Sequence, residues 1–238
     1  MRNIRRRLMI TEAAHQKWLN TPIDFEDAEV KRICVENFGG ESGITNKRYG
    51  TVGVAGMAGE LTRRQAAEVS YFGDLFRDNP AIVKFNEFRY FTGYFSGSII
   101  KRQAFCKGSV NLTEITTPPT TRVLSYYWLF QDALPNALTK VTLNEGLESI
   151  QYIFLDKATS LRKLVLPSSL REIKSGSMTY YGLKLSVLVL KSAVPPVNTQ
   201  PPNLISVDMY VPDESVGLYK AADGYQADKV HPMSEYQE

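Results

Sequence analysis

Apolar positions recur in the middle of the chain as a short phrase. Each copy has a leucine, two variable residues, a branched aliphatic residue, one variable residue and a final apolar residue, the first copy being the weakest. The leading leucines follow one another in steps of 26, 23 and 24 residues: Leu112, Leu138, Leu161 and Leu185. The last four residues of each copy alternate between apolar and polar positions, which is typical of a short β-strand with one buried face.

A second set of large apolar residues precedes these leucines by seven or eight positions: Phe105, Phe130, Phe154 and Met178. Two sets of apolar anchors at a fixed offset indicate an internal repeat of about 24 residues. One repeat cannot bury both of its faces alone, so neighbouring repeats must stack to form a continuous core. The sequence therefore predicts an α/β solenoid, a short right-handed leucine-rich-repeat coil of about five turns with helical ends.

The two ends of the chain lack this pattern and carry helix signals instead. A helix is predicted over 24–38 with Asp24 as its cap, and another over 61–73, where Thr62 and Gln65 have capping-box spacing. Between them lies a loop, 39–59, with seven glycines. At the other end, a strand over 209–211 leads into a helix predicted over 213–222, which Gly224 ends.

These patterns divide the chain into four segments. A basic N-terminal arm (1–20) is followed by a helical N-terminal cap with the glycine-rich loop (21–80). The leucine-rich repeats (81–212) and a C-terminal helical cap (213–238) complete the chain.

Several stretches resemble one known family. LRKLVLPSSLREI (Leu161–Ile173) and SIIKRQAF (Ser98–Phe105) resemble the BspA-like leucine-rich repeats of gut bacteria and their phages. The run VLKSAVPPV…MYVPDESVGLYKAADGY is similar to their closing strand and helix, and the stretch Ala58–Gly93 resembles their helical lead-in. The resemblance implies an adhesive or ligand-binding module exposed on a cell surface or encoded by a phage.

The chain departs from the family pattern at two places. Members often read Ala-Phe-x-x-Cys at the second apolar anchor, whereas Cys106 here follows Phe105 directly. Relatives with the helical lead-in can carry an Asp-rich, calcium-like loop. The corresponding loop here is glycine-rich, with Glu41 and Glu60 as its acids, so we expect no bound calcium.

Charge is concentrated at the start of the chain. The net charge is +3, from 28 basic and 25 acidic residues, and the first ten residues carry four arginines and no acid: Arg2, Arg5, Arg6 and Arg7. Residues 11–238 hold 24 basic and 25 acidic residues, so we expect no nucleic-acid surface on the folded body. The basic arm instead suggests docking to an acidic partner, an assembly surface or a second copy.

No stretch approaches the ~18 apolar residues of a membrane span. Only Leu8–Ile10 follow the arginines before Thr11 and Glu12, which is shorter than the apolar core of a signal peptide. We therefore expect neither a membrane span nor an export signal. A phage particle or an intracellular assembly is the favoured location, and a bacterial surface is the alternative.

Residues for catalysis or metal binding are sparse. His15 and His231 lie at opposite ends of the chain, which supports neither a catalytic triad nor a histidine metal cluster. Cys34 and Cys106 are predicted to be buried thiols rather than a disulfide. The glycines over 50–59 lack the Lys-Ser/Thr ending of a phosphate loop. We predict no enzyme, no cofactor and no metal.

The alternation within each leucine phrase predicts two outward columns across neighbouring strands. The first column is Glu114, Lys140, Lys163, Val187 and Asp208; the second is Thr116, Thr142, Val165, Val189 and Tyr210. Glu114 and Lys140 are placed to pair across strands. Val165, Val189 and Tyr210 are predicted to form an exposed apolar strip that contacts a partner or the proline-rich loop 193–202.

Candidate ligand-binding residues are therefore this strip together with Lys140 and Lys163. Two aromatic clusters extend the candidate surface: Tyr126, Tyr127 and Trp128, and Tyr180 and Tyr181. They fit either a tyrosine-rich recognition strip or filling of the core. The functional hypothesis is a non-catalytic binding module for a protein or glycan ligand, with a structural assembly or spacer protein as the alternative.

Overall fold

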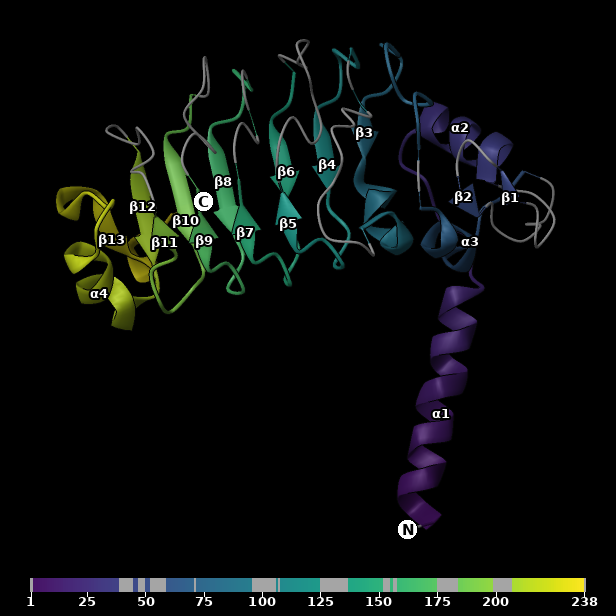
Figure 1. The fold of residues 1–238 in the computed structure, drawn as a ribbon, viewed down its shortest axis with the longest axis horizontal. Helices are drawn as coiled ribbons and strands as arrows, with labels where there is room; N and C mark the ends of the chain where they lie inside the picture. Colours follow the sequence, from purple (N-terminus) through teal and green to yellow (C-terminus); the bar gives the residue numbers. More distant parts are fainter. Residues whose placement is uncertain are drawn as a thin grey trace.

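The computed structural model describes most of the 238 residues. Its described ranges are 2–38, 45–46, 50–51, 59–70, 72–95, 106, 108–124, 137–151, 155, 158–174, 184–198 and 207–237. Side chains are not described for 2–10, 45–46, 50–51 and 94–95. Strands fill the centre of the structure, and most of its helices lie at the two ends (Figure 1).

Two parallel sheets form the centre of the structure. The seven-stranded sheet has the order β13-β12-β10-β8-β6-β4-β3. Its strands are β3 (Lys84–Phe85), β4 (Glu114–Thr116), β6 (Lys140–Thr142), β8 (Lys163–Leu166), β10 (Val187–Leu190), β12 (Asp208–Val211) and β13 (Val230–Pro232). The four-stranded sheet, in the order β11-β9-β7-β5, is made of β5 (Val123–Leu124), β7 (Ser149–Ile150), β9 (Glu172–Ile173) and β11 (Val197–Asn198).

The apolar positions of the leucine phrases fill the core, as predicted. All four leading leucines are buried: Leu112, Leu138, Leu161 and Leu185. The strands pair in the register that places like positions side by side, so Leu188 lies beside Leu164, and Leu190 beside Leu166. Burial of these apolar side chains stabilises the pairing of strands that are distant in sequence.

The predicted fold class is nevertheless wrong. Instead of a leucine-rich-repeat solenoid, the structure has two parallel sheets with few helices, an α/β arrangement in which no solenoid is detected. The alternating pattern correctly predicts strands, but a pattern of this kind does not determine the path of the chain between them. The segments that follow two of the leucine phrases supply the strands β7 and β9 of a second sheet, which the pattern of the phrases does not indicate. Part of the connecting chain, with the predicted anchors Phe105, Phe130, Phe154 and Met178, lies outside the described residues.

The N-terminal region combines two short helices with an aromatic core. Helix α2 (Ala28–Phe38) begins later than predicted, because its cap is Asp27 and not Asp24: Asp27 Oδ1 accepts hydrogen bonds from the backbone N–H groups of Glu29 and Val30. Helix α3 (Arg63–Glu68) is shorter than predicted but has the expected capping box of Thr62 and Gln65. Buried phenylalanine rings join these helices to the sheet: Phe38, Phe72, Phe76, Phe85, Phe88 and Phe91.

Smaller elements complete the N-terminal half. The antiparallel strands β1 (Thr45–Asn46) and β2 (Gly50–Thr51) lie within the glycine-rich stretch. The 3₁₀ turns η1 (Asn86–Tyr90) and η2 (Thr92–Phe95) follow β3.

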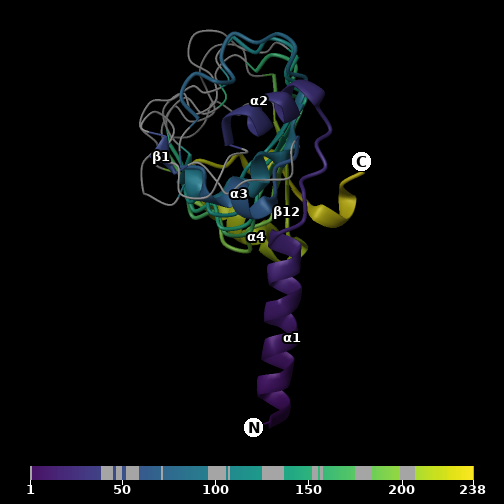
Figure 2. The same cartoon turned by 90° about the vertical axis from the view of Figure 1, so that its right-hand side faces the viewer.

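The predicted basic arm is largely a helix. Helix α1 (Arg2–Leu19) projects from the body, and both views show it extending well beyond the sheets (Figures 1 and 2). Its side chains over 11–19 are mostly exposed. None of the helices in the described part of the chain is long and apolar enough to cross a membrane.

The C-terminal region differs from the single helix predicted over 213–222. The chain forms a 3₁₀ turn, η3 (Asp213–Ser215), and then the short helix α4 (Val216–Ala221). A further turn, η4 (Ala227–Lys229), leads into β13, a strand that the sequence pattern did not predict. The last turn is η5 (Met233–Glu235). After η5, Tyr236 contacts Lys163 of β8 and Tyr210 of β12.

Candidate binding site on the seven-stranded sheet

The two predicted outward columns are present in the seven-stranded sheet, on a side that we call the outer face. In the first column, Glu114 lies beside Lys140, and Val187 lies between Lys163 and Asp208. The second column is likewise in register, through the successive pairs of Thr116, Thr142, Val165, Val189 and Tyr210. The register predicted from the sequence is therefore confirmed on this face.

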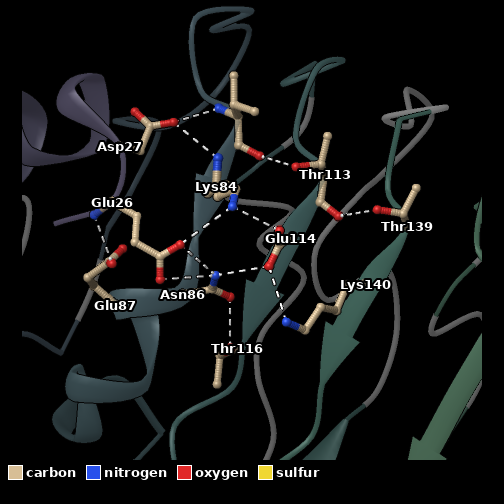
Figure 3. A network of polar contacts seen from close by, with 11 residues as sticks. Glu26, Asp27, Lys84, Asn86, Glu87, Thr113, Glu114, Thr116, Thr139 and Lys140 are labelled. Atoms are coloured by element: carbon tan, nitrogen blue, oxygen red, sulfur yellow. Dashed lines mark hydrogen bonds and ion pairs between the residues drawn. The ribbon is translucent and has the colours of Figure 1, made fainter. Parts of the chain in front are cut away.

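A charged network covers the N-terminal end of the outer face (Figure 3). Glu114 lies between two lysines, with Lys84 Nζ at 3.0 Å and Lys140 Nζ at 3.4 Å from its carboxylate oxygens. Lys84 Nζ also lies 3.7 Å from Glu26. The hydrogen bond from Lys84 is the largest cause that lowers the pKa of Glu114, because it stabilises the carboxylate. The predicted pair of Glu114 and Lys140 thus exists, but it is shared with a second cation.

The same network buries the start of the second column. Thr116 Oγ1 donates a 2.9 Å hydrogen bond to Asn86 Oδ1, and both residues are buried. The amide nitrogen of Asn86 contacts Glu26 and Glu114 in turn. Because these side chains satisfy one another, Thr116 and Asn86 have little hydrogen-bonding capacity left for a ligand.

Aromatic residues cover the C-terminal end of the outer face. The Tyr210 ring lies 5.4 Å from the His231 ring and 5.0 Å from the Tyr236 ring, centroid to centroid. Lys163 Nζ lies 4.6 Å from the centre of the Tyr236 ring, within cation–π range. Tyr236 therefore spans from β12 to β8 and lies above β10, where Val189 is 5% exposed.

Charged residues at this end also pair with one another. Asp208 Oδ1 lies 3.1 Å from Lys229 Nζ and 3.3 Å from His231 Nε2. The hydrogen bond from Lys229 is the main cause that lowers the pKa of the Asp208 carboxyl. His231 thus contacts both outward columns, through Asp208 and Tyr210.

The predicted exposed apolar strip is corrected by this arrangement. Val165 and Tyr210 are half-buried and Val189 is buried, because the C-terminal segment returns over the face. The proline-rich loop, the alternative cover, instead contributes β11 to the four-stranded sheet, where Val197 lies beside Glu172. The alternation of the strands correctly predicts the direction of these side chains, but it contains no information on a segment more than 20 residues later in the chain.

Between the two covered ends lies a hollow of about 420 Å³, which we call the lysine pocket. Its lining residues are Thr139, Lys140, Val141, Thr142, Leu143, Lys163, Val165 and Lys191. It forms between β6 and β8, which are paired at a single position, Thr142 with Val165. The neighbouring strands β8 and β10 are paired over four residues.

Three lysines give the lining of the lysine pocket a positive charge: Lys140, Lys163 and Lys191. Lys140 has 64% of its side chain exposed, and its partner Glu114 is shared with Lys84, so the positive charge of Lys140 is only partly balanced. Lys163 and Lys191 come from β8 and from the position directly after β10. Thr142 adds a hydroxyl group and Val165 an apolar surface. This set of groups suits a ligand that carries negative charge and hydrogen-bond acceptors.

Several predicted site residues are not brought to this face by any described contact. Tyr126, Tyr127, Trp128, Tyr180 and Tyr181 lie outside the described residues. Arg2, Arg5, Arg6 and Arg7 belong to helix α1, but their side chains are not described. Two residues at this face, Lys191 and Tyr236, are not among the predicted site residues. A lysine that directly follows a strand was a usable signal for Lys191, whereas no pattern indicates Tyr236.

Groups for metal or thiol chemistry are not gathered at this face. Among the described residues, no three of His, Cys, Asp and Glu cluster as a metal site would require. Cys34 and Cys106 are buried free thiols, and burial raises the pKa of each thiol well above its usual value. The described cysteines are therefore poor nucleophiles.

Comparison with known proteins does not assign the chain to a family. No protein-family model matches it, and no curated protein matches it either. What the site can bind is therefore inferred from its own side chains: the three ammonium groups, a threonine hydroxyl and the neighbouring Tyr236 ring.

Proposed function

We propose that this protein is a non-catalytic binding module for a protein or glycan ligand, which binds on the outer face of the seven-stranded sheet. The proposal rests on the difference between the covered ends of that face and the open hollow between them. Side chains of the chain itself cover both ends, while the lysine pocket lies between them. Ligand sites in proteins are typically concave, with a few polar groups that fix the orientation of the ligand.

The composition of the pocket favours a ligand with acidic groups. Lys140, Lys163 and Lys191 can donate charge-assisted hydrogen bonds to carboxylates or sulfates. Tyr236, which contacts Lys163, adds an aromatic ring at the rim, and such rings pack against sugar rings and apolar side chains alike. The resemblance of the sequence to BspA-like repeats, with the adhesive function that it implies, agrees with this proposal and forms part of it.

The test combines an array with charge-reversal variants. The protein is applied to an array of neutral, sialylated and sulfated glycans and to a panel of extracellular-matrix proteins. Lys140→Glu and Lys163→Glu should each weaken binding to the best probe by about tenfold or more, because one attractive charge becomes repulsive. Val165→Lys should also weaken binding by obstructing the pocket. Val189 is not used, since its burial would confound stability with binding.

Lys220→Glu is the matched control, because Lys220 is exposed on helix α4, away from the lysine pocket. It makes the same charge change and should leave binding intact. An equal loss in this control would point to non-specific attraction between charges. No binding to any glycan or protein of the array would contradict the proposal.

A second function, structural assembly, is favoured by one observation. Helix α1 projects from the body, and its side chains over 11–19 are mostly exposed (Figure 2). A projecting helix with a basic start suits attachment to an acidic partner or to a second copy. A mass measurement by light scattering in the same experiment discriminates the two functions. A stable oligomer that the removal of residues 1–10 disperses, without loss of array binding, would indicate assembly in addition to binding.

A further inference from the structure

A second hollow lies at the base of helix α1, away from the lysine pocket. It encloses about 260 Å³ and takes its walls from α1, α3, the turns after β3 and two later loops. We call it the arginine pocket; its lining residues are Trp18, Leu19, Arg63, Ala67, Arg89, Tyr90, Thr92, Pro119 and Asn144. The proposed binding function on the sheet does not use any of these residues.

Two guanidinium groups stack on aromatic rings in the arginine pocket. The Arg63 guanidinium carbon lies 4.8 Å from the centre of the Trp18 ring and 5.2 Å from that of Tyr90. Arg89 lies over the Tyr90 ring at 4.9 Å. Trp18 and Tyr90 meet edge to face with their centres 6.1 Å apart. Stacking of this kind leaves the N–H edges of a guanidinium available for a ligand.

Among the described residues, few hydrogen-bond partners face these two arginines. Each guanidinium has five N–H donors. Arg63 Nη1 donates to the Trp18 carbonyl oxygen at 3.3 Å, and Arg89 Nη2 donates to the Tyr90 hydroxyl at 3.2 Å. Within the described part of the chain, neither arginine forms an ion pair with a carboxylate. Arg63 Nε is buried and has no hydrogen-bond partner there.

A buried guanidinium nitrogen without a partner is costly, because desolvation of a charged donor is not offset. A negative charge beside the guanidinium would lower this cost by Coulomb attraction, and the two oxygens of a carboxylate match the fork of N–H donors of an arginine. The surrounding Trp18, Leu19, Ala67 and Pro119 supply an apolar frame beside these charges. The volume fits a small molecule and not a folded partner.

We propose that the arginine pocket binds a small organic carboxylate whose acid group is attached to a ring or another compact apolar frame. The carboxylate oxygens accept hydrogen bonds from Arg63 and Arg89, and the frame packs against Trp18 and Tyr90. Because Trp18 belongs to α1 and is 46% exposed, the bound ligand would also hold the base of that helix against the body.

The test uses benzoate as the carboxylate probe and benzamide as its neutral counterpart of nearly the same shape. The chain has two tryptophans, so Trp128→Phe leaves Trp18 with the one indole N–H signal in an NMR spectrum. At physiological ionic strength, benzoate should shift this signal to saturation. Benzamide should bind about tenfold more weakly or not at all, because it lacks the charge that the guanidiniums attract.

Arginine variants assign the effect to the pocket. Arg63→Gln and Arg89→Gln should each raise the dissociation constant of benzoate by roughly tenfold. Arg89→Gln is the decisive variant if Arg63→Gln disturbs α1, since Arg89 stacks on Tyr90 and not on the helix. Arg77→Gln, which removes an arginine that pairs with Asp74, is the control and should leave binding unchanged.

Three results would overturn the proposal. Equal affinity for benzamide and benzoate would mean that the pocket recognises the aromatic ring and not the carboxylate. The absence of a saturable shift up to about 20 mM benzoate, a concentration that detects even weak sites, would mean that no carboxylate site exists. An equal loss in Arg77→Gln would mean that charge acts non-specifically. None of these results bears on the lysine pocket, so failure here is distinguishable from failure of the proposed function.

Discussion

At the two ends of the seven-stranded sheet, the outer face is covered by different kinds of side chain. At the N-terminal end, Thr116 is buried beneath the polar side chain of Asn86 and beside the charges of Glu114. At the C-terminal end, Val189 is buried beneath aromatic rings, with Tyr236 spanning from β8 to β12. Both positions belong to the same outward column and are related by strand register.

Strand register determines the direction in which each side chain points, whereas the neighbouring segments determine whether that side chain is exposed. A polar cover is specific, because each of its buried groups requires a particular partner at hydrogen-bond distance. An aromatic cover depends mainly on area and shape. We therefore expect substitutions at the N-terminal end to be the more damaging, and those at the C-terminal end to be milder.

The largest effect is expected at the N-terminal edge, for Asp27→Ala. Asp27 Oδ1 caps α2, and Asp27 Oδ2 accepts hydrogen bonds from the backbone N–H groups of Val83 at 2.7 Å and Lys84 at 3.0 Å (Figure 3). The substitution removes a cap and leaves the buried N–H of Val30 and the partly buried N–H groups of Val83 and Lys84 without partners, so the free energy of unfolding should fall by about 3 kcal/mol. Denaturant unfolding followed by circular dichroism measures the change.

Asp24→Ala is the matched control for this prediction. Asp24 is exposed and lies three residues earlier in the same segment, so its removal should change the free energy of unfolding by less than about 0.5 kcal/mol. Equal effects of the two substitutions would contradict the assignment of Asp27 as the residue that joins α2 to β3.

A smaller effect is expected at the C-terminal end, for Tyr236→Ala. The substitution removes the ring that contacts Tyr210 and Lys163 and uncovers Val189, so the free energy of unfolding should fall by about 1.5 kcal/mol. Tyr236→Phe keeps the ring and should leave stability nearly unchanged. A loss as large as that of Asp27→Ala would reverse the ranking of the two ends.

The smallest effect concerns a buried acid at the N-terminal end, Glu87. One of its oxygens accepts a hydrogen bond from the backbone N–H of Glu26 at 3.1 Å, and the other has no partner among the described residues. Burial raises the pKa of Glu87, so the folded state binds its proton more tightly than the unfolded state does. The free energy of unfolding therefore falls as the pH rises above the pKa that Glu87 has in the unfolded chain. Below that pKa, Glu87 is protonated in both states and does not lower the stability.

Glu87→Gln imitates the protonated acid and should raise the free energy of unfolding at neutral pH, by less than the change at Tyr236. The gain over the unmodified protein should shrink as the pH falls toward 4, where Glu87 itself becomes protonated. Parallel unfolding curves at several pH values measure this difference. A gain that does not depend on pH would mean that packing, and not charge, is responsible.

Local structure and strand register could be predicted from the sequence alone. Leucine spacing predicted the central strands and their buried faces, and the side chains of Thr62 and Gln65 predicted the start of α3. Alternation then predicted which residues, including Lys140 and Lys163, lie on the outer face. These features depend on residues that are near one another in the chain or that recur at a fixed spacing, so they can be predicted from a sequence pattern.

The fold class, the cover of the outer face and the two pockets could not be predicted in this way. The second sheet, the strand β13 and the return of Tyr236 over β10 each depend on contacts between distant segments. The arginine pocket likewise joins Trp18 to Arg63 and Tyr90, which are far apart in the sequence. A periodic pattern in the sequence does not predict contacts between distant residues, because these contacts depend on the path of the whole chain and on the packing that stabilises it.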